Sequence, residues 1–266
     1  MQTVTKLGIA NMLKQNYDEA GRQFQKAMGS PNSFERQIAR TQWVNLLIYQ
    51  GRLKEALAAN RNALDADRLE GLGAESLARI ITESRLHFHL GDVNKAWEVL
   101  EPLRTYDDKN DTYKMSLYDR APITNVWYLA TLGRDQEALK MIDSVRAEKK
   151  TKSDADVVAD RMQAVYSWVN RDYQKAIELY KSVDAKQATF VSKFELARAY
   201  VDGGFFAEAA ELLEKTSRSY DDVRFKEAAI YNSLLSYYLG RANEGIGRTK
   251  DAIKNYETFL DIWEKA

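Results

Sequence analysis

Polar and apolar residues follow a helical period along most of the chain. In the stretch NYDEAGRQFQKAM, which begins at Asn16, the apolar residues Ala20, Phe24 and Ala27 are spaced by four and three positions. This spacing places the three side chains on one face of a helix. The β-branched residues are scattered and do not form the alternating runs that are typical of strands. The pattern therefore predicts an all-α chain.

The same pattern recurs around seven alanines. Apolar residues mostly follow each alanine at four and seven positions, and a small residue usually precedes it by twelve. Five residues before the alanine stands a glycine in five cases, and Gln15 or Arg171 in the other two. At those two turns we expect the neighbouring Asn16 and Asn170 to supply the left-handed conformation, which asparagine tolerates. The marker alanines are Ala20, Ala56, Ala96, Ala138, Ala176, Ala209 and Ala252.

Each recurrence predicts a helix, a tight turn and a second helix. The small residue on the first helix and the alanine on the second allow close approach, since larger side chains would push the helices apart. A hairpin this short cannot bury its own apolar face and must stack on its neighbours. We predict one repeat domain over 1–266, a right-handed superhelical array of about seven antiparallel hairpins. Its units lie near 1–34, 35–74, 75–112, 113–154, 155–187, 188–222 and 223–266.

Three of these stretches carry a family resemblance. They are LGIANMLKQNYDEAGRQFQKAM at 7–28, FELARAYVDGGFFAEAAELLEKT at 194–216 and LGRANEGIGRTKDAIKNYETFL at 239–260. Their small residues and alanines fall at the spacing of the tetratricopeptide repeat (TPR) family, which they resemble. The middle units depart from that pattern, with Glu83, Asn125 and Gln163 where a large apolar residue is usual. The resemblance implies an α-solenoid that binds proteins without catalysis.

Two segments interrupt the hairpins. Pro102 is expected to end or bend one helix, and Pro122 disfavours helix at Ala121. The segments 104–122, which contains DDKND, and 146–156 are rich in charge, and we predict loops for both. Neither is long enough to mark a separate domain.

Composition narrows the functional classes. The 39 basic and 39 acidic residues cancel, which argues against a nucleic-acid binder. The chain has no cysteine, so it has no disulfide, thiolate metal site or cysteine nucleophile. No apolar run reaches the length of a membrane span. The compartment is not fixed by these facts; the cytoplasm is favoured, and a piece of a longer or membrane-anchored protein is the alternative.

The search for catalytic chemistry finds no constellation of the required residues. His87 and His89 are two residues apart on a predicted helix, where their side chains diverge, so we expect a packed pair and no metal site. Gly71 and Gly73 lack the preceding strand and the third glycine of a nucleotide-binding loop. We found no P-loop, nucleophile elbow or HExxH motif. The expectation is a protein without enzyme activity, cofactor or metal.

The family resemblance also implies where a ligand binds. It places the groove along the first helix of each hairpin, at positions fifteen, eleven and eight before the marker alanine. Arginines there can pair with carboxylates, and aromatic residues can cover apolar side chains. The family's clamp for a chaperone's terminal carboxylate is not expected, since Thr5 and Ile9 occupy its first positions. The predicted binding residues are Asn45, Arg85, Phe88, Trp127, Arg161, Trp168, Phe194, Arg198, Tyr237 and Arg241.

Three functional readings follow. The leading one is a non-catalytic scaffold that binds a peptide or partner domain in its concave groove. The alternative is a regulatory or sensor module cut from a larger bacterial kinase or transcription regulator, because YYLGRANEGIGRTKDAIKNYETFLDIWEKA is similar to the C-terminal ends of such proteins. An enzyme on an α/α scaffold is the least favoured, since every catalytic signal fails.

Overall fold

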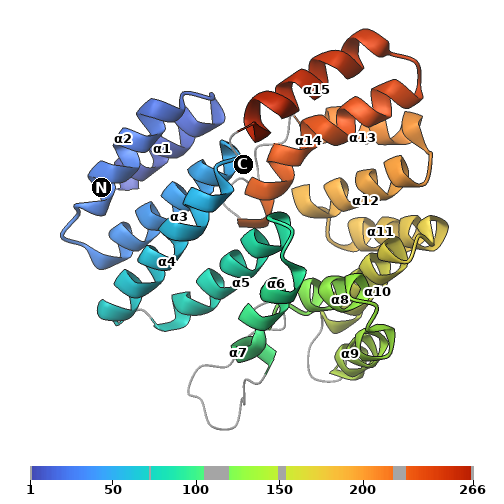
Figure 1. Cartoon of the computed structure of the whole chain (residues 1–266), viewed down its shortest axis with the longest axis horizontal. Coiled ribbons are helices and arrows are strands. Elements are labelled where there is room, and N and C mark those ends of the chain that lie inside the picture. Colours follow the sequence, from blue (N-terminus) through green and yellow to red (C-terminus); the bar gives the residue numbers. More distant parts are fainter. Residues whose placement is uncertain (1, 72, 105–119, 149–153, 218–225, 265–266) are drawn as a thin grey trace. The chain divides into compact units, whose positions relative to one another are not determined.

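The computed structural model describes residues 2–71, 73–104, 120–148, 154–217 and 226–264 (Figure 1). Within these ranges every regular element is an α-helix or a single helical turn, and fifteen α-helices are present. The predicted all-α fold of stacked helical hairpins is confirmed. The predicted DDKND turn lies outside the described residues.

The chain separates into two compact units. Unit 1 comprises residues 1–99 together with 262–266, and unit 2 comprises residues 100–261. In unit 1, α1 packs on α2, α3 on α4 and α5 on α6, while α2 contacts α3 and α4 contacts α5. The helices of this unit are α1 (Gln2–Leu13), α2 (Tyr17–Met28), α3 (Ser33–Tyr49), α4 (Leu53–Leu69), α5 (Gly73–His89) and α6 (Val93–Val99).

Unit 2 contains four further hairpins after the short helix α7 (Glu101–Arg104). The first helices of neighbouring hairpins touch, as α8 contacts α10 and α12 contacts α14, and each second helix packs against the first helix that follows it. The helices are α8 (Pro122–Thr131), α9 (Asp135–Ala147), α10 (Ala155–Val169), α11 (Tyr173–Lys186), α12 (Phe190–Asp202), α13 (Phe206–Thr216), α14 (Lys226–Gly245) and α15 (Thr249–Trp263), whose last residues fall in unit 1.

Each marker alanine lies in the buried centre of its hairpin. All seven are buried, six of them completely and Ala252 with 3% of its surface exposed. The facing position explains why small residues recur there: a Cβ added at Gly8 would overlap the ring of Phe24, and one added at Gly240 would lie 2.7 Å from the ring of Tyr256. In the third hairpin Ser84 fills this position and its hydroxyl donates to the carbonyl of Ala96 at 2.7 Å. Close helix packing was therefore correctly predicted from these residues.

The turn position differs from the prediction at two hairpins. Gln15 and Arg171 themselves adopt the left-handed conformation, with φ of 60° and 64°, as the five glycines at this position do. Asn16 and Asn170 have negative φ values of −86° and −81°. The expectation that the asparagines make these turns is wrong. The packing of the two helices determines which position adopts the left-handed conformation. This position stays the same when the residue there is not glycine.

Proline defines the helix boundaries as predicted. The helix α8 begins at Pro122, and Ala121 before it is left-handed with φ of 49°. The helix α6 ends at Val99, and Pro102 lies in the first turn of the separate helix α7. In the charged segment 146–156, α9 ends at Ala147 and α10 begins at Ala155. The residues 149–153 between them lie outside the described part of the chain.

Candidate binding face of the second unit

Seven of the ten predicted binding residues lie in unit 2, each on the first helix of its hairpin. They are Trp127 on α8, Arg161 and Trp168 on α10, Phe194 and Arg198 on α12, and Tyr237 and Arg241 on α14. We call the surface formed by these helices the first-helix face of unit 2. The contacts below show which of its residues come together.

Arg198 contacts the rings of two tryptophans. Its guanidinium carbon is 3.7 Å from the ring centre of Trp168 and 4.8 Å from that of Trp127. The two indoles meet edge to face, with their centres 5.8 Å apart. A cation over an indole face is held electrostatically as well as by packing. Three helices thus contribute one side chain each to a single cluster.

Arg161 is paired within the protein. Its Nε and Nη2 atoms each donate to the carboxylate of Glu195 at 2.8 Å, and the Tyr231 hydroxyl donates to the same carboxylate at 3.2 Å. The Glu195 side chain is almost fully buried, so this is an interior ion pair in the geometry that suits a guanidinium best. Arg161 is therefore already occupied by a carboxylate of its own chain.

Asp202 holds a second pair of predicted residues. One oxygen accepts from Arg241 Nη1 at 2.6 Å, and the other accepts from the indole nitrogen of Trp168 at 2.8 Å. The Arg241 guanidinium also lies 5.9 Å from the ring centre of Tyr237. With about a third of its side chain exposed, Arg241 is the most accessible of the three arginines on this face.

The two remaining aromatic residues behave differently. Phe194 has no exposed surface and stacks on Tyr231 with ring centres 4.8 Å apart, so it contributes to the core. Tyr237 is half-buried and packs on Phe259 and Tyr256 of α15 at 5.2 and 6.3 Å. Of these two residues, Tyr237 is the one that remains partly exposed on the first-helix face.

Three predicted residues belong to unit 1. Asn45 lies on α3 and is buried, while Arg85 and Phe88 lie half-buried on α5. The ring of Phe88 meets that of His89 edge to face at 5.6 Å. These residues are not part of the clustered face on unit 2.

The sequence analysis missed the carboxylates of this face. Glu195 lies 34 residues after Arg161, and Asp202 lies 34 residues after Trp168. This separation equals one repeat of the family that the sequence resembles. A search for complementary polar residues one repeat apart would have found both pairs.

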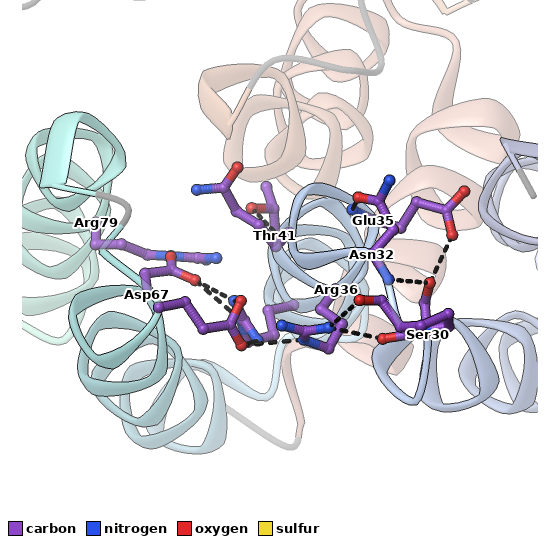
Figure 2. A network of polar contacts seen from close by, with 11 residues as sticks. Ser30, Asn32, Glu35, Arg36, Thr41, Asp67 and Arg79 are labelled. Carbon is purple, nitrogen blue, oxygen red and sulfur yellow. Dashed lines mark hydrogen bonds and ion pairs between the residues drawn. The ribbon is translucent and has the colours of Figure 1, made fainter.

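Unit 1 contains its own polar network, which Figure 2 shows in part. Asp67 is fully buried and accepts from Arg40 Nη2 at 2.6 Å and from Arg79 Nε at 3.1 Å. Glu70 accepts from Arg40 Nη1 at 3.0 Å and from Arg36 Nε at 3.1 Å. The hydrogen bonds from Arg40 and Arg36 lower the pKa of Glu70 to about 2. The network joins α3, α4 and α5.

The start of α3 is fixed by the residues at the other end of this network (Figure 2). The Asn32 side chain accepts from the backbone N–H of Glu35 at 3.2 Å, which caps the helix. The Ser30 hydroxyl donates to the Glu35 carboxylate at 2.8 Å, and the Ser30 carbonyl accepts from Arg36 at 2.8 Å. These bonds set where the second hairpin begins.

The predicted packing of the histidines can be followed at His87. Its Nε2 lies 3.2 Å from Arg61 Nη2, and burial lowers the pKa of His87. In the ranges that the structure describes, no group of three or more histidine or carboxylate side chains could hold a metal ion. None of the described helices is both long enough and apolar enough to cross a membrane.

A family model described as tetratricopeptide repeat matches residues 194–266. This part of the chain matches the TPR family. The matched TPR segment runs from α12 to α15 and includes Arg198, Asp202, Tyr237 and Arg241. TPR folds commonly serve as protein-interaction scaffolds.

Several solved structures of TPR proteins are similar to this chain at low identity. A TPR protein from Parabacteroides merdae ATCC 43184 shares 15% identity over 99% of this chain and 97% of its own, with a TM-score of 0.48. The TPR-like repeats of a putative kinesin light chain from Podosopora anserina share 21% identity over 86% and 96%, with a TM-score of 0.34. Yeast Tom70 shares 14% identity over 98% and 62%, with a TM-score of 0.35. No curated protein matches the sequence.

Proposed function

We propose that the chain is a non-catalytic scaffold that binds a peptide segment of a partner protein on the first-helix face of unit 2. The observation that supports this is the cluster of Trp127, Trp168 and Arg241, which are all partly exposed. They lie on the first helices α8, α10 and α14, and Asp202 of α12 bonds both Trp168 and Arg241. Tryptophan, tyrosine and arginine are the residue types that dominate binding energy at protein interfaces.

The face is also held in its binding conformation before any partner arrives. Trp168 is fixed by its hydrogen bond to Asp202, and Trp127 and Trp168 meet edge to face. Side chains that are already ordered lose less conformational entropy on association. An extended segment that lies across these helices would bury the remaining indole surface, and this burial would contribute to affinity.

Selection from a random-peptide display library on the intact chain tests this proposal. We expect enriched peptides to bind Trp168→Ala at least about tenfold more weakly than wild type, because truncating a central interface residue removes much of the binding energy. Trp97→Ala, on α6 of unit 1, is the matched control and should bind as wild type does.

Circular dichroism must show that both variants keep their helix content. The proposal fails if no peptide is enriched above a blank surface. It also fails if every enriched peptide binds the folded Trp168→Ala variant with wild-type affinity.

A further inference from the structure

Neighbouring hairpins stack by packing the second helix of one against the first helix of the next. This joint recurs at five places among the described helices: α2 on α3, α4 on α5, α9 on α10, α11 on α12 and α13 on α14. Two helices offer only one half of it. The second helix α15 is followed by no described first helix, and the first helix α1 is preceded by no described second helix.

Contacts inside the chain show which positions of a second helix face the next first helix. A Cβ added at Gly21, one residue after its marker alanine, would lie 3.2 Å from the Trp43 ring on α3. Arg61, five residues after its marker alanine, donates to Glu83 on α5 at 2.9 Å. Arg146, eight residues after its marker alanine, bonds a carboxylate on α10. Positions one, five and eight after the marker alanine therefore form the receiving surface of a second helix.

The same contacts identify the matching position on a first helix. Trp43 and Glu83 both stand thirteen residues before the marker alanine of their hairpin. Leu196 holds this position on α12 and is only 6% exposed, because α11 packs against α12. Leu7 holds it on α1 and is 49% exposed. The same residue type at the same position is thus covered inside the array and uncovered on α1.

The receiving surface of α15 is uncovered in the same way. Ile253 stands one residue after the marker alanine and is 51% exposed, whereas Ile177 at this position of α11 is 3% exposed. Leu260 stands eight residues after the marker alanine and is 61% exposed, whereas Leu64 at this position of α4 is 8% exposed. The helix α15 therefore presents apolar side chains at positions that a first helix covers elsewhere in the chain.

We propose that the chain binds a second copy of itself head to tail, with α1 of one copy packed against α15 of the other. Leu7 of one copy covers Ile253 and Leu260 of the next, and their burial drives the association. The joint repeats one that the chain already forms five times, so neither helix has to change conformation. Because the two surfaces differ, the interface is heterologous and each copy can bind two neighbours.

Charge favours α1 over a second α15 as the occupant. Glu257 on α15 takes the position that Arg61 takes on α4, where the charge pairs with an opposite charge on the next first helix. The helix α1 supplies the exposed Lys6 beside Leu7 and contains no acidic residue. A second α15 would instead bring another Glu257 to this surface, and like charges disfavour association.

Sedimentation velocity of the intact chain over a wide concentration range tests the proposal. We expect wild type to form species larger than a dimer as the concentration rises. Leu7→Glu and Ile253→Glu each place a carboxylate in every joint, so each variant alone should stay monomeric at the same concentrations. The matched control is Leu69→Glu, which changes a residue on α4 that is 90% exposed and should associate as wild type does.

A mixture of the two variants decides which surfaces meet. Leu7→Glu keeps an intact α15 surface, and Ile253→Glu keeps an intact α1 surface. An equimolar mixture should therefore form a dimer with one copy of each and nothing larger. Circular dichroism must show that each variant keeps its helix content. Leu7→Gln and Ile253→Gln, which remove the same apolar contact, replace a glutamate variant that does not.

Three results would overturn the proposal. A wild-type chain that stays monomeric at every concentration would show that the two end helices have another partner. Association that survives in Leu7→Glu alone would indicate a symmetric contact between α15 helices. A mixture of folded variants that stays monomeric would show that α1 and α15 do not bind each other. None of these results bears on peptide binding, because both substitutions lie outside the first-helix face of unit 2.

Discussion

At the residue scale, the turn position shows that hairpin packing can impose a conformation that the residue itself disfavours. Arg171 carries a left-handed backbone, which costs a non-glycine residue roughly 1–2 kcal/mol. Five other hairpins place glycine at the same position. The chain therefore has two positions at which its own repeat pattern identifies a better residue.

We predict that Arg171→Gly raises the free energy of unfolding by about 0.5–1 kcal/mol, because the relieved strain exceeds the added entropy of the unfolded chain. Urea denaturation measures this change. The neighbouring Asn170→Gly is the control and should lower stability, since Asn170 has a negative φ. A loss of stability in Arg171→Gly would contradict the prediction.

A second residue-scale prediction concerns acid. The pKa of Glu70 falls from its ordinary value of 4.5 to about 2 because Arg40 and Arg36 bond its carboxylate. The ionised form is thus favoured in the folded state, and this contribution is complete above pH 4.5 and disappears as the pH falls through 2. Because Glu70 is partly exposed, we expect Glu70→Gln to cost less than about 1 kcal/mol at neutral pH.

The test is the difference in urea midpoint between wild type and Glu70→Gln across this pH range. The difference should shrink steadily below pH 4.5. A difference that stays constant down to pH 2 would show that the carboxylate charge contributes nothing.

The sequence predicted the buried alanines and the small residues that face them because steric exclusion depends on residue size, which can be read directly. It did not predict the left-handed Gln15 and Arg171, because local preference favours the adjacent asparagines. The packing of two helices outweighs a cost of this size, and that packing is not visible in a short window of sequence.

At the scale of the helical element, Gly8 and Phe24 illustrate how tightly a hairpin is packed. Alanine is the better helix former by about 1 kcal/mol, but its Cβ at position 8 would overlap the Phe24 ring. We therefore predict that Gly8→Ala destabilises the wild-type chain by about 1–2 kcal/mol, because overpacking outweighs propensity.

In a Phe24→Leu background the sign should reverse. The smaller side chain leaves room for the Cβ, so Gly8→Ala should then raise the melting temperature. A destabilisation of equal size in both backgrounds would show that the contact with Phe24 is not the cause.

The candidate site was predictable only in part at this scale. The positions that the family resemblance implies lie on the first helices α8, α10, α12 and α14 of unit 2. The sequence analysis treated the arginines as available, whereas Arg161 and Arg241 are bonded to Glu195 and Asp202. Which side chain meets which depends on the offset between stacked hairpins, and the irregular spacing of the middle units hides that offset.

At the scale of the whole molecule, the chain forms two compact units. We therefore expect a substitution that destabilises one unit to have little effect on the stability of the other. Asp67→Asn removes a buried carboxylate that both Arg40 and Arg79 bond, so we expect a loss of about 3–5 kcal/mol. Hydrogen exchange should accelerate in α3, α4 and α5 and change little in α10 to α13. Equal acceleration throughout the chain would mean that the units unfold as one.

The bonds between successive first helices have a consequence for engineering. Arg161 and Trp168 each depend on a residue one hairpin later, Glu195 and Asp202 respectively. A single hairpin transplanted into a foreign solenoid would carry half of each bond and expose an unmatched charge to its new neighbour. The smallest piece that keeps both of these bonds is two hairpins in tandem, α10 to α13, so recombination that preserves them must exchange the two hairpins together.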